Sequence, residues 1–332
     1  MSEFGKIAVI GGGSWATALA KLLLDNNDRL IWYMHRQDRI DDFIRYRHNP
    51  VYLSDVAFDT ARIDFTCDID EACRRADTLV VAVPSPYFKG IADGITEDIS
   101  GKHIVSAVKG IVPSDNMIVT EYFAERFGCD DSNLLVIGGP CHAEEVALQR
   151  LSYLTIGCHD VAKSRSFAHL LDGGKMKTII SSDVAGIEYG AVLKNVYAIA
   201  AGIVSGMKSG DNFMAMLVCN AVREMRAFID AIAPMERDIC RSAYLGDLLV
   251  TAYSRFSRNH NFGSMIGKGY SVTAAKMEMA QVAEGYYGTK CIHEINTSRV
   301  GVEMPILDCV HSILYKEVNA RRAFDRITDG FT

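Results

Sequence analysis

A glycine-rich segment near the start of the chain has the spacing of a loop that holds the phosphates of a dinucleotide. A short apolar run at 6–10 leads into the sequence GGGSWA at 11–16 and then into a stretch with helical spacing. In this G-x-G-x-x-A pattern, Gly11 allows a tight turn, Gly13 lets a pyrophosphate approach the backbone, and Ala16 permits close helix packing. The phosphates would lie on the free amides at the positive end of that helix. A glycine-rich turn that only makes a tight strand-to-helix connection is the alternative.

The end of the second expected strand bears on which dinucleotide would bind. An acidic residue at this place would hold the ribose 2′-hydroxyl of NAD, but the run here ends in His35 and Arg36, and the nearest acid is Asp38. Because an arginine can accept a 2′-phosphate, the sequence permits NADPH and is compatible with a preference for it. An ordinary exposed basic turn is the alternative.

One lysine lies where a proton donor could be made. Lys194 is the one charged residue of an apolar helical segment at 191–201. Apolar surroundings destabilise an ammonium and lower its pKa toward the range of a general acid or base. Hydride transfer to a ketone needs such a group, because the new hydroxyl must receive a proton. A surface lysine that snorkels to solvent is the alternative.

Other polar residues could bind an anionic substrate or orient the proton donor. Lys109 directly follows the expected strand at 103–108, so it lies at a carboxyl end of the sheet, where ligands of doubly wound folds bind. The triplet Ser257-Arg258-Asn259 offers a hydroxyl, a guanidinium and an amide for an oxyanion, or else is a polar turn. Asp247 could be only the N-cap of the helix that follows it.

The elements that must position these residues begin with an α/β part. Short apolar runs, typical of strands buried in a parallel sheet, alternate with helical stretches such as 14–27 and 117–127. The alternation predicts a doubly wound sheet of the Rossmann type. The runs lie at 6–10, 30–35, 78–83, 103–108, 134–137 and 152–157.

After about Ser182 the strand signals nearly stop and an all-α part follows. Glycine-rich stretches at 202–210 and 263–269 punctuate its helices, and Asn212 is expected to be an N-cap. We therefore expect an NAD(P)-binding Rossmann domain at 1–182 and a helical substrate-binding and catalytic domain at 183–332. The clearest helical stretches lie at 184–204, 212–233 and 275–287.

Composition excludes several classes of protein. With 35 basic and 41 acidic residues, the net charge of −6 argues against a nucleic-acid or anionic-membrane surface. The longest apolar run near the middle, 196–204, is far shorter than the ~20 residues of a membrane helix, and the N-terminus lacks the pattern of a signal peptide. The nine cysteines have no zinc-knuckle spacing, and the nine histidines form no metal-ligand pattern. We expect a cytoplasmic protein with reduced thiols and no metal.

Eight segments occur in one order over nearly the whole chain: GGGSWATALA (11–20), VAVPS (81–85), VKG (108–110), GGPCHAEEVA (138–147), LKNVYAIA (193–200), GDLLVT (246–251), SRN (257–259) and VAEG (282–285). Together they resemble the bacterial type of the NAD(P)-dependent glycerol-3-phosphate dehydrogenase family. The resemblance implies an oxidoreductase that uses NADPH or NADH to reduce dihydroxyacetone phosphate reversibly to sn-glycerol 3-phosphate, the precursor of the phospholipid backbone. It also implies a second domain like the C-terminal domain of 6-phosphogluconate dehydrogenase.

The resemblance implies roles for the residues at the substrate. Lys194 would be the proton donor in reduction, Lys109 would face both the substrate and the nicotinamide, and Asp247 would orient the lysine and contact a substrate hydroxyl. Asn195 could bind substrate or face the other way on its helix. The remaining substrate contacts would be the phosphate-binding triplet Ser257, Arg258 and Asn259, together with Gly139 and, less surely, Cys141.

The same resemblance implies contacts to the cofactor. The pyrophosphate would lie under Ser14 and Trp15, beside the glycines Gly11 and Gly13, and the adenosine ribose near His35 and Arg36. Glu284 could instead be a solvated surface glutamate. The other implied contacts are Lys109, Ala143, Arg258 and Val282.

The sequence departs from the family pattern at three places. Ala16 replaces the usual glycine, Cys141 replaces the usual serine or threonine and is a poorer hydrogen-bond donor, and the segment 65–75 matches loosely.

Two other functions remain as alternatives. One is a related dehydrogenase of another hydroxy acid or sugar phosphate, of the 6-phosphogluconate or ketopantoate type, and the other is a dinucleotide sensor without turnover. A homodimer is expected by analogy with related helical domains.

Overall fold

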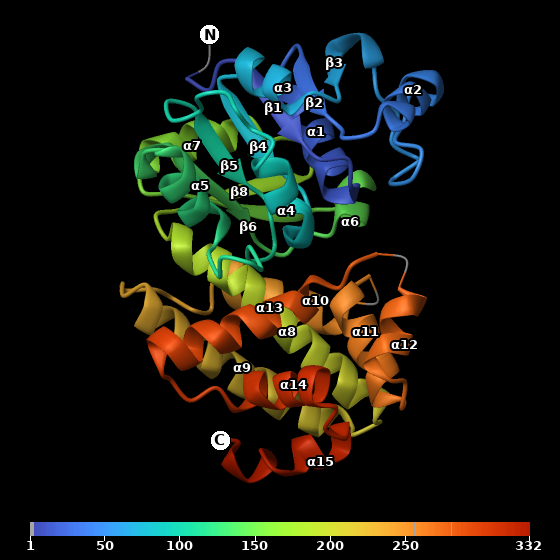
Figure 1. Cartoon of the computed structure of the whole chain (residues 1–332), viewed down its shortest axis with the longest axis vertical. Coiled ribbons are helices and arrows are strands. Elements are labelled where there is room, and N and C mark those ends of the chain that lie inside the picture. Colours follow the sequence, from blue (N-terminus) through green and yellow to red (C-terminus); the bar gives the residue numbers. More distant parts are fainter. Residues whose placement is uncertain (1–2, 255, 280) are drawn as a thin grey trace. The chain divides into compact units, whose positions relative to one another are not determined.

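The chain divides into two compact units, which Figure 1 shows in the colours of the sequence. The computed structural model describes residues 3–254, 256–279 and 281–332. One unit comprises Met1–Val108 and Ile118–Ile187, and the other comprises Lys109–Met117 and Glu188–Thr332. The first is an α/β unit and the second is helical, so the predicted fold class is confirmed.

The first unit is built on one sheet of eight strands in the order β3-β2-β1-β4-β5-β6-β7-β8. From β3 to β6 all neighbours are parallel. The order reverses at β1 and β4, and this switch point is where doubly wound sheets bind ligands at their carboxyl edge. The strands are β1 (Ile7–Ile10), β2 (Leu30–Tyr33), β3 (Ile63–Thr66), β4 (Thr78–Val81), β5 (His103–Ser106), β6 (Leu134–Gly138), β7 (Ser152–Cys158) and β8 (Met176–Ser181).

The far part of the sheet differs from the sequence prediction. β7 runs antiparallel to β6, with Gly138 opposite Thr155, and parallel to β8. The run at 152–157, expected among the strands of a parallel sheet, therefore departs from that expectation in its pairing with β6. The connection between them contains only the five-residue helix α6 (Ala143–Ala147). An antiparallel return accepts such a short connection, whereas a parallel crossover usually carries a longer helix. The strands β3 and β8 were not predicted, because they are partly exposed and lack long apolar runs.

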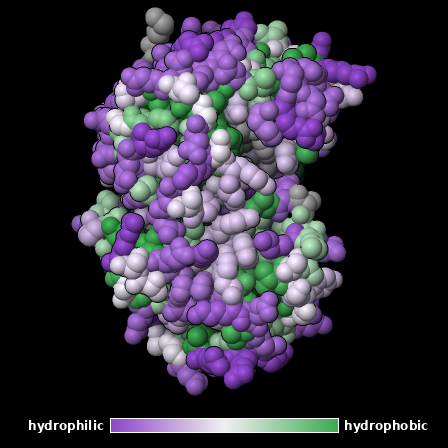
Figure 2. Space-filling view, viewed as in Figure 1, coloured by the Kyte–Doolittle hydropathy of each residue, from purple (hydrophilic) through white to green (hydrophobic). Residues whose placement is uncertain are grey.

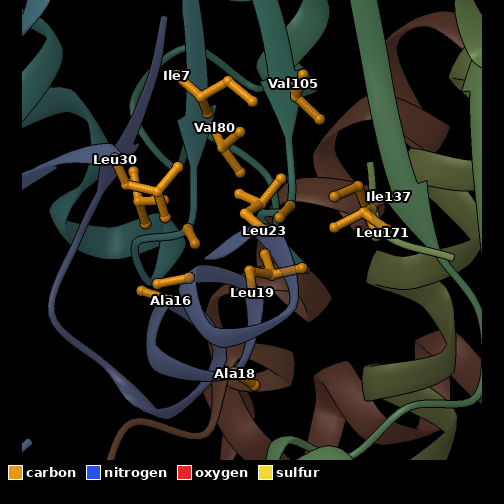
Figure 3. Close-up of a cluster of buried hydrophobic side chains, with 14 of the residues drawn as sticks. Ile7, Ala16, Ala18, Leu19, Leu23, Leu30, Val80, Val105, Ile137 and Leu171 are labelled. Atoms are coloured by element: carbon orange, nitrogen blue, oxygen red, sulfur yellow. The ribbon is translucent and has the colours of Figure 1, made fainter. Parts of the chain in front are cut away.

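Helices cover both faces of the sheet. In Figure 3, Leu19 and Leu23 of α1 point toward Val80, Val105 and Ile137 of the strands, and all five are buried. On the other face, α4 and α5 meet through an edge-on contact of two aromatic rings, 5.2 Å apart. The helices of this unit, besides α6, are α1 (Ser14–Asn26), α2 (Gln37–Tyr46), α3 (Ile69–Arg75), α4 (Ser85–Ala92), α5 (Val119–Phe127) and α7 (Val161–His169).

The second unit contains most of α8 and the helices that follow it. The single helix expected at 275–287 was wrong: α12 ends at Glu278 and α13 begins at Glu284, because α13 receives its own N-terminal partner from Asn259. Asn212 is not an N-cap either, since Gly210, at φ +88°, fills that place. The helices are α8 (Val184–Gly206), α9 (Asp211–Ile232), α10 (Asp247–Tyr253), α11 (Arg258–Gly267), α12 (Val272–Glu278), α13 (Glu284–Ile295), α14 (Pro305–Lys316) and α15 (Ala320–Asp325).

Glycines let α8 and α11 pack backbone against backbone. A Cβ on Gly202 would lie 2.1 Å from the carbonyl oxygen of His260, and a Cβ on Gly263 would lie 2.1 Å from that of Ile199. The stretches at 202–210 and 263–269 do punctuate the helices, because α8 ends at Gly206 and α11 ends at Gly267, but Gly202 and Gly263 lie inside those helices and serve their packing. Such close approach is possible only without side chains.

The contact also sets the register of the two helices. Gly263 meets Ile199, and one turn further along both helices Gly267 meets Ile203. The helices therefore run side by side in the same direction, and one turn earlier α8 carries Asn195 where α11 carries Asn259. The start of α11 is thus brought to the part of α8 that carries Lys194.

The helix α8 is long and apolar enough to cross a membrane, but its most apolar stretch is completely buried inside the protein. It is therefore the core helix of its unit.

A carboxylate on α9 is also buried in the second unit. Glu224 accepts the amides of Ile306 and Leu307 at 2.8 and 2.9 Å and so caps α14. Burial raises the pKa of Glu224 to about 8.

We predict that Gly202→Ala destabilises the protein. The added methyl would overlap the backbone of α11, at a cost of about 1–3 kcal/mol for an overpacked core, which lowers Tm by several degrees. The matched control is Gly90→Ala inside α4, where a Cβ would meet no atom within 4 Å, so Tm should hold or rise. Thermal unfolding of both variants is the measurement, and equal Tm values would contradict the close helix contact.

Candidate active site

The loop after β1 has the geometry of a phosphate cradle. Gly11 has φ +126°, and a Cβ there would lie 2.6 Å from the carbonyl oxygen of Ala82. At Gly13, the N-cap of α1, a Cβ would meet nothing within 4 Å, so the space beside this residue is open. Ser14 and Trp15 form the beginning of that turn. These features fit a dinucleotide pyrophosphate on the amides of α1.

Asn49 fixes this loop, and the sequence reasoning missed it. Its buried side-chain amide donates to the carbonyl of Gly12 at 3.0 Å and to Oγ1 of Thr17 at 2.8 Å. Its Oδ1 in turn accepts the amides of Val51 and Tyr52. The only signal in the sequence was the pair Asn49-Pro50, which indicates a turn and no more.

The basic pair after β2 lies at the surface. His35 is exposed, and Arg36 is the N-cap residue of α2. The Arg36 guanidinium donates from Nε to Oδ1 of Asp38 at 2.9 Å and from Nη2 to the second oxygen. This hydrogen bonding lowers the pKa of Asp38 and raises the pKa of Arg36. The cation expected to meet a 2′-phosphate therefore already has an anionic partner.

Three further candidates in the first unit follow β6. Gly139, at φ +105°, turns the chain where a Cβ would crowd the backbone of β7. Cys141 is buried, and its thiol donates to the carbonyl of Tyr153 at 3.1 Å, so toward a ligand the sulfur is left as an acceptor. Ala143 is the buried first residue of α6. All three lie beyond the carboxyl end of a strand, at the edge that binds ligands.

A buried ion pair forms the centre of the second unit. Nζ of Lys194 lies 2.5 Å from Oδ1 of Asp247, and the two side chains are only 4% and 3% exposed. The surface-lysine alternative was wrong, and so was the N-cap alternative, because Gly246 precedes α10 and the Asp247 carboxylate turns to Lys194. Burial destabilises the ammonium while the carboxylate stabilises it.

The second carboxylate oxygen of Asp247, Oδ2, does not take part in this ion pair. Among the described residues, Oδ2 of Asp247 is buried and has no hydrogen-bond partner. Thr251, one turn along α10, donates to the main-chain carbonyl of Asp247 at 2.6 Å and approaches Oδ1 at 3.4 Å. Sequence reasoning missed Thr251. A buried acceptor without a donor is costly, so Oδ2 is suited to a hydroxyl brought by a ligand.

Asn195 connects this pair to the segment that carries Lys109. Its side-chain amide donates to the carbonyl of Lys109 at 2.8 Å. The side chain therefore faces that segment. Lys109 is half-buried and belongs to the second unit, although it lies only three residues after the end of β5 in the first unit. Lys194, Asp247 and the backbone of Lys109 thus lie in one unit.

The triplet at 257–259 begins α11 rather than forming a bare turn. Ser257 caps the helix by accepting the amide of His260 at 3.2 Å, which leaves its hydroxyl hydrogen to donate. Arg258 donates to the carbonyl of Val282 at 3.3 Å. Oδ1 of Asn259 accepts the amide of Gly285 at 2.9 Å. The positive end of a ten-residue helix is suited to an oxyanion.

The start of α13 joins this cluster. A Cβ on Gly285 would lie 2.5 Å from the carbonyl oxygen of Asn195. The preceding residue, Glu284, is buried at the first helical position, so the solvated-glutamate alternative was wrong. Asn195, Asn259 and Gly285 therefore meet at one place in the second unit. Across residues 3–254, 256–279 and 281–332, no three His, Cys, Asp or Glu side chains are grouped as metal ligands.

Comparison with known proteins gives one family for both parts of the chain. Residues 6–164 match the model of the NAD-dependent glycerol-3-phosphate dehydrogenase N-terminus, and residues 183–325 match that of the C-terminus. A glycerol-3-phosphate dehydrogenase [NAD(P)+] of Lysinibacillus sphaericus is 32% identical over 97% of this chain and 95% of its own. Another, from Lactobacillus delbrueckii subsp. bulgaricus, is 33% identical over 97% and 96%.

The solved structure of glycerol-3-phosphate dehydrogenase from Coxiella burnetii is similar over 98% of both chains, with a TM-score of 0.89 and 26% identity. The likeness therefore extends over both units of the fold and not only over the dinucleotide-binding sheet, which many unrelated enzymes share.

We predict that Asn49→Ala weakens dinucleotide binding about tenfold, because two hydrogen bonds that hold the phosphate loop are lost. Asn26→Ala is the matched control: Asn26 also donates to two main-chain carbonyls, but from the last turn of α1. Titration of NADPH or NADH by calorimetry compares the variants. Equal dissociation constants for the two would mean that Asn49 does not support the loop.

Proposed function

Because the chain belongs to the NAD-dependent glycerol-3-phosphate dehydrogenase family, we propose that it catalyses the reversible reduction of dihydroxyacetone phosphate to sn-glycerol 3-phosphate with NADPH or NADH. The observation that carries the proposal is the buried pair of Lys194 and Asp247, whose Oδ2 has no hydrogen-bond partner among the residues that the structure describes. A buried charge pair is costly to maintain for stability alone. A proton donor oriented by a carboxylate, next to an acceptor for a hydroxyl, is what reduction of a hydroxyketone requires.

In this proposal Lys194 holds the proton that the ketone oxygen receives, and takes it back in oxidation. Asp247 keeps the lysine in place through Oδ1, and its Oδ2 accepts a hydrogen bond from the neighbouring substrate hydroxyl. When bound, the nicotinamide supplies or receives the hydride. Lys109 adds a second cation that draws the ketone oxygen toward Lys194. Asn195 fixes the backbone of Lys109 and faces the substrate from α8.

The substrate phosphate is assigned to the start of α11. Ser257, Arg258 and Asn259 would supply a hydroxyl, a guanidinium and an amide, and the first amides of the helix add to them. The register of α8 and α11 supports the assignment, because it sets the start of α11 beside the turn of α8 that carries Lys194. A phosphate at one end and a ketone at the other would then be held across a fixed span.

The first domain is assigned to the cofactor. The cradle of Gly11 and Gly13, whose open space fits a pyrophosphate, would hold it together with Ser14 and Trp15, while His35 and Arg36 would lie near the adenosine ribose. Gly139 and Cys141 would approach the substrate from this domain. The remaining proposed cofactor contacts are Lys109, Ala143, Arg258, Val282 and Glu284.

A steady-state assay with dihydroxyacetone phosphate and both cofactors tests the activity, and we predict that Lys194→Ala lowers kcat about 10²–10⁴-fold, as expected for a lost general acid. Cofactor binding should be retained, because Lys194 lies outside the phosphate loop. Lys316→Ala, an exposed lysine at the end of α14, is the control. An unchanged kcat would refute the role of Lys194, and turnover with only another hydroxy acid, or none at all, would favour a related dehydrogenase or a sensor.

We predict that Arg36→Ala lowers the ratio of kcat/KM for NADPH to that for NADH about tenfold, because a charge-assisted contact to the 2′-phosphate is lost. Asp38→Asn should raise the same ratio, since it frees the guanidinium from its present partner. Asp42→Asn, one turn farther along α2 than Asp38, makes the same charge change as a control. Equal effects on both cofactors would place the 2′-phosphate elsewhere.

Three wider assignments complete the proposal. The product would supply the glycerophospholipid backbone, and the protein would act in the cytoplasm. Figure 2 shows a mainly hydrophilic surface with separate apolar groups. Large apolar side chains that are exposed on the second unit support a homodimer formed there. They are Met216, Met235, Leu249, Tyr253, Phe256, Tyr270 and Met277. A molar mass in solution of twice the chain mass would support this dimer, and the mass of one chain would refute it.

A further inference from the structure

The segment Lys109–Met117 is a closed loop of the second unit. It begins directly after Val108 at the end of the β5 region, yet it groups with the helices that follow Glu188. A tight hairpin closes it: the amide of Val112 donates to the carbonyl of Met117, and the amide of Asn116 donates to that of Val112, both at 2.9 Å. Asn116 has φ +53°, a conformation that asparagine and glycine adopt most readily.

Side chains from two helices hold this loop at its ends. At the first end, Asn195 of α8 donates to the carbonyl of Lys109 at 2.8 Å. At the other, the side-chain amide of Asn116 donates to Oε2 of Glu294 on α13 at 3.0 Å. Between them the thiol of Cys291, also on α13, lies 3.8 Å from the carbonyl oxygen of Pro113.

The helix that holds the second end is itself fixed to the catalytic cluster. The start of α13 meets α8 at the backbone of Asn195 and receives Oδ1 of Asn259 on the amide of Gly285. Its last turn carries Glu294. The same helix, α13, therefore contacts the turn of α8 that carries Lys194 and also holds Asn116. Through Asn116 and the rest of the loop, it constrains where Lys109 lies.

We propose that Asn116 and Glu294 are positioning residues for Lys109. Neither is assigned a contact with substrate or cofactor, and the inference rests on the proposed role of Lys109 at the ketone. Without the contact of Asn116 to Glu294, the nine-residue loop would be bound to the helices only near Lys109 and Pro113, and it would retain backbone freedom that spreads the lysine over more positions. A second attachment removes that freedom before substrate binds, and small displacements of a catalytic cation are costly in rate.

The test separates positioning from plain stability. Asn116→Gly removes the amide but still adopts φ +53°, and Glu294→Ala removes the acceptor from the other side. Each should lower kcat/KM for dihydroxyacetone phosphate about 5–20-fold, with the dissociation constant of NADPH unchanged within about twofold. Glu294→Gln keeps an acceptor oxygen and should restore most of kcat/KM. Ser114→Ala, at the exposed tip of the same hairpin, is the control.

A double-mutant comparison with Lys109 tests whether Asn116 acts through this lysine. In a Lys109→Ala background, Asn116→Gly should change kcat/KM by less than about twofold, because residues that act through the same group are not additive. The same 5–20-fold loss in both backgrounds, or a lower Tm with normal kcat/KM, would overturn the positioning role. If Lys109→Ala alone left kcat/KM intact, the proposed role of Lys109 would fail. A wild-type protein without activity on dihydroxyacetone phosphate would instead refute the proposed function.

Discussion

A lysine and an aspartate buried together in a helical unit impose the main constraint on this molecule. Taking one charge out of water costs several kcal/mol, and the partner offsets this only if it is held at contact distance. Lys194 and Asp247 lie 53 residues apart, on different helices. The unit must therefore hold α8 and α10 rigidly against each other. Within α10, the hydroxyl of Thr251 donates to the main-chain carbonyl of Asp247 and lies 3.4 Å from its Oδ1, which helps to orient the carboxylate.

The glycine contact between α8 and α11 extends the same rigidity to the rest of the candidate site. Side chains at this contact would separate the helices, and each rotamer would permit a different spacing. Backbone contact leaves one spacing and one register, visible in the matched pairs Ile199 with Gly263 and Ile203 with Gly267. The proposed proton donor on α8 and the proposed oxyanion-binding end of α11 are thereby held at one separation, which is what a substrate of fixed length needs.

Strong local patterns allowed much of the fold to be predicted. Apolar runs revealed six of the strands, and the apolar helical segment around Lys194 indicated burial while leaving a surface lysine as the alternative. Strand direction was not predictable at β7, because a period of two is the same in parallel and antiparallel pairs. The break before Glu284 was hidden as well, since the partner that begins α13 is Asn259, distant in the sequence.

The parts of the candidate site that escaped prediction are single polar residues. Asn49, Thr251 and Asn116 each act through hydrogen bonds to partners that only the fold brings near. A lone polar residue in a loop or on a short helix has no periodicity, so nothing in the sequence distinguishes it from a solvated one. The residues that were predicted, by contrast, belong to motifs in which several positions carry the signal together.

Burial also decides which charges of this acidic chain can serve an anionic ligand. Lys194 and Arg36 both face a carboxylate, but the first pair is almost fully buried and the second is about half exposed. Water can replace either partner of the exposed pair, so a phosphate can displace Asp38 from Arg36 at small cost. Nothing replaces Asp247 without leaving Lys194 as an unpaired buried charge. A cation paired with an aspartate is therefore a permanent pair in the helical unit, where we propose the proton donor, and an exchangeable pair after β2.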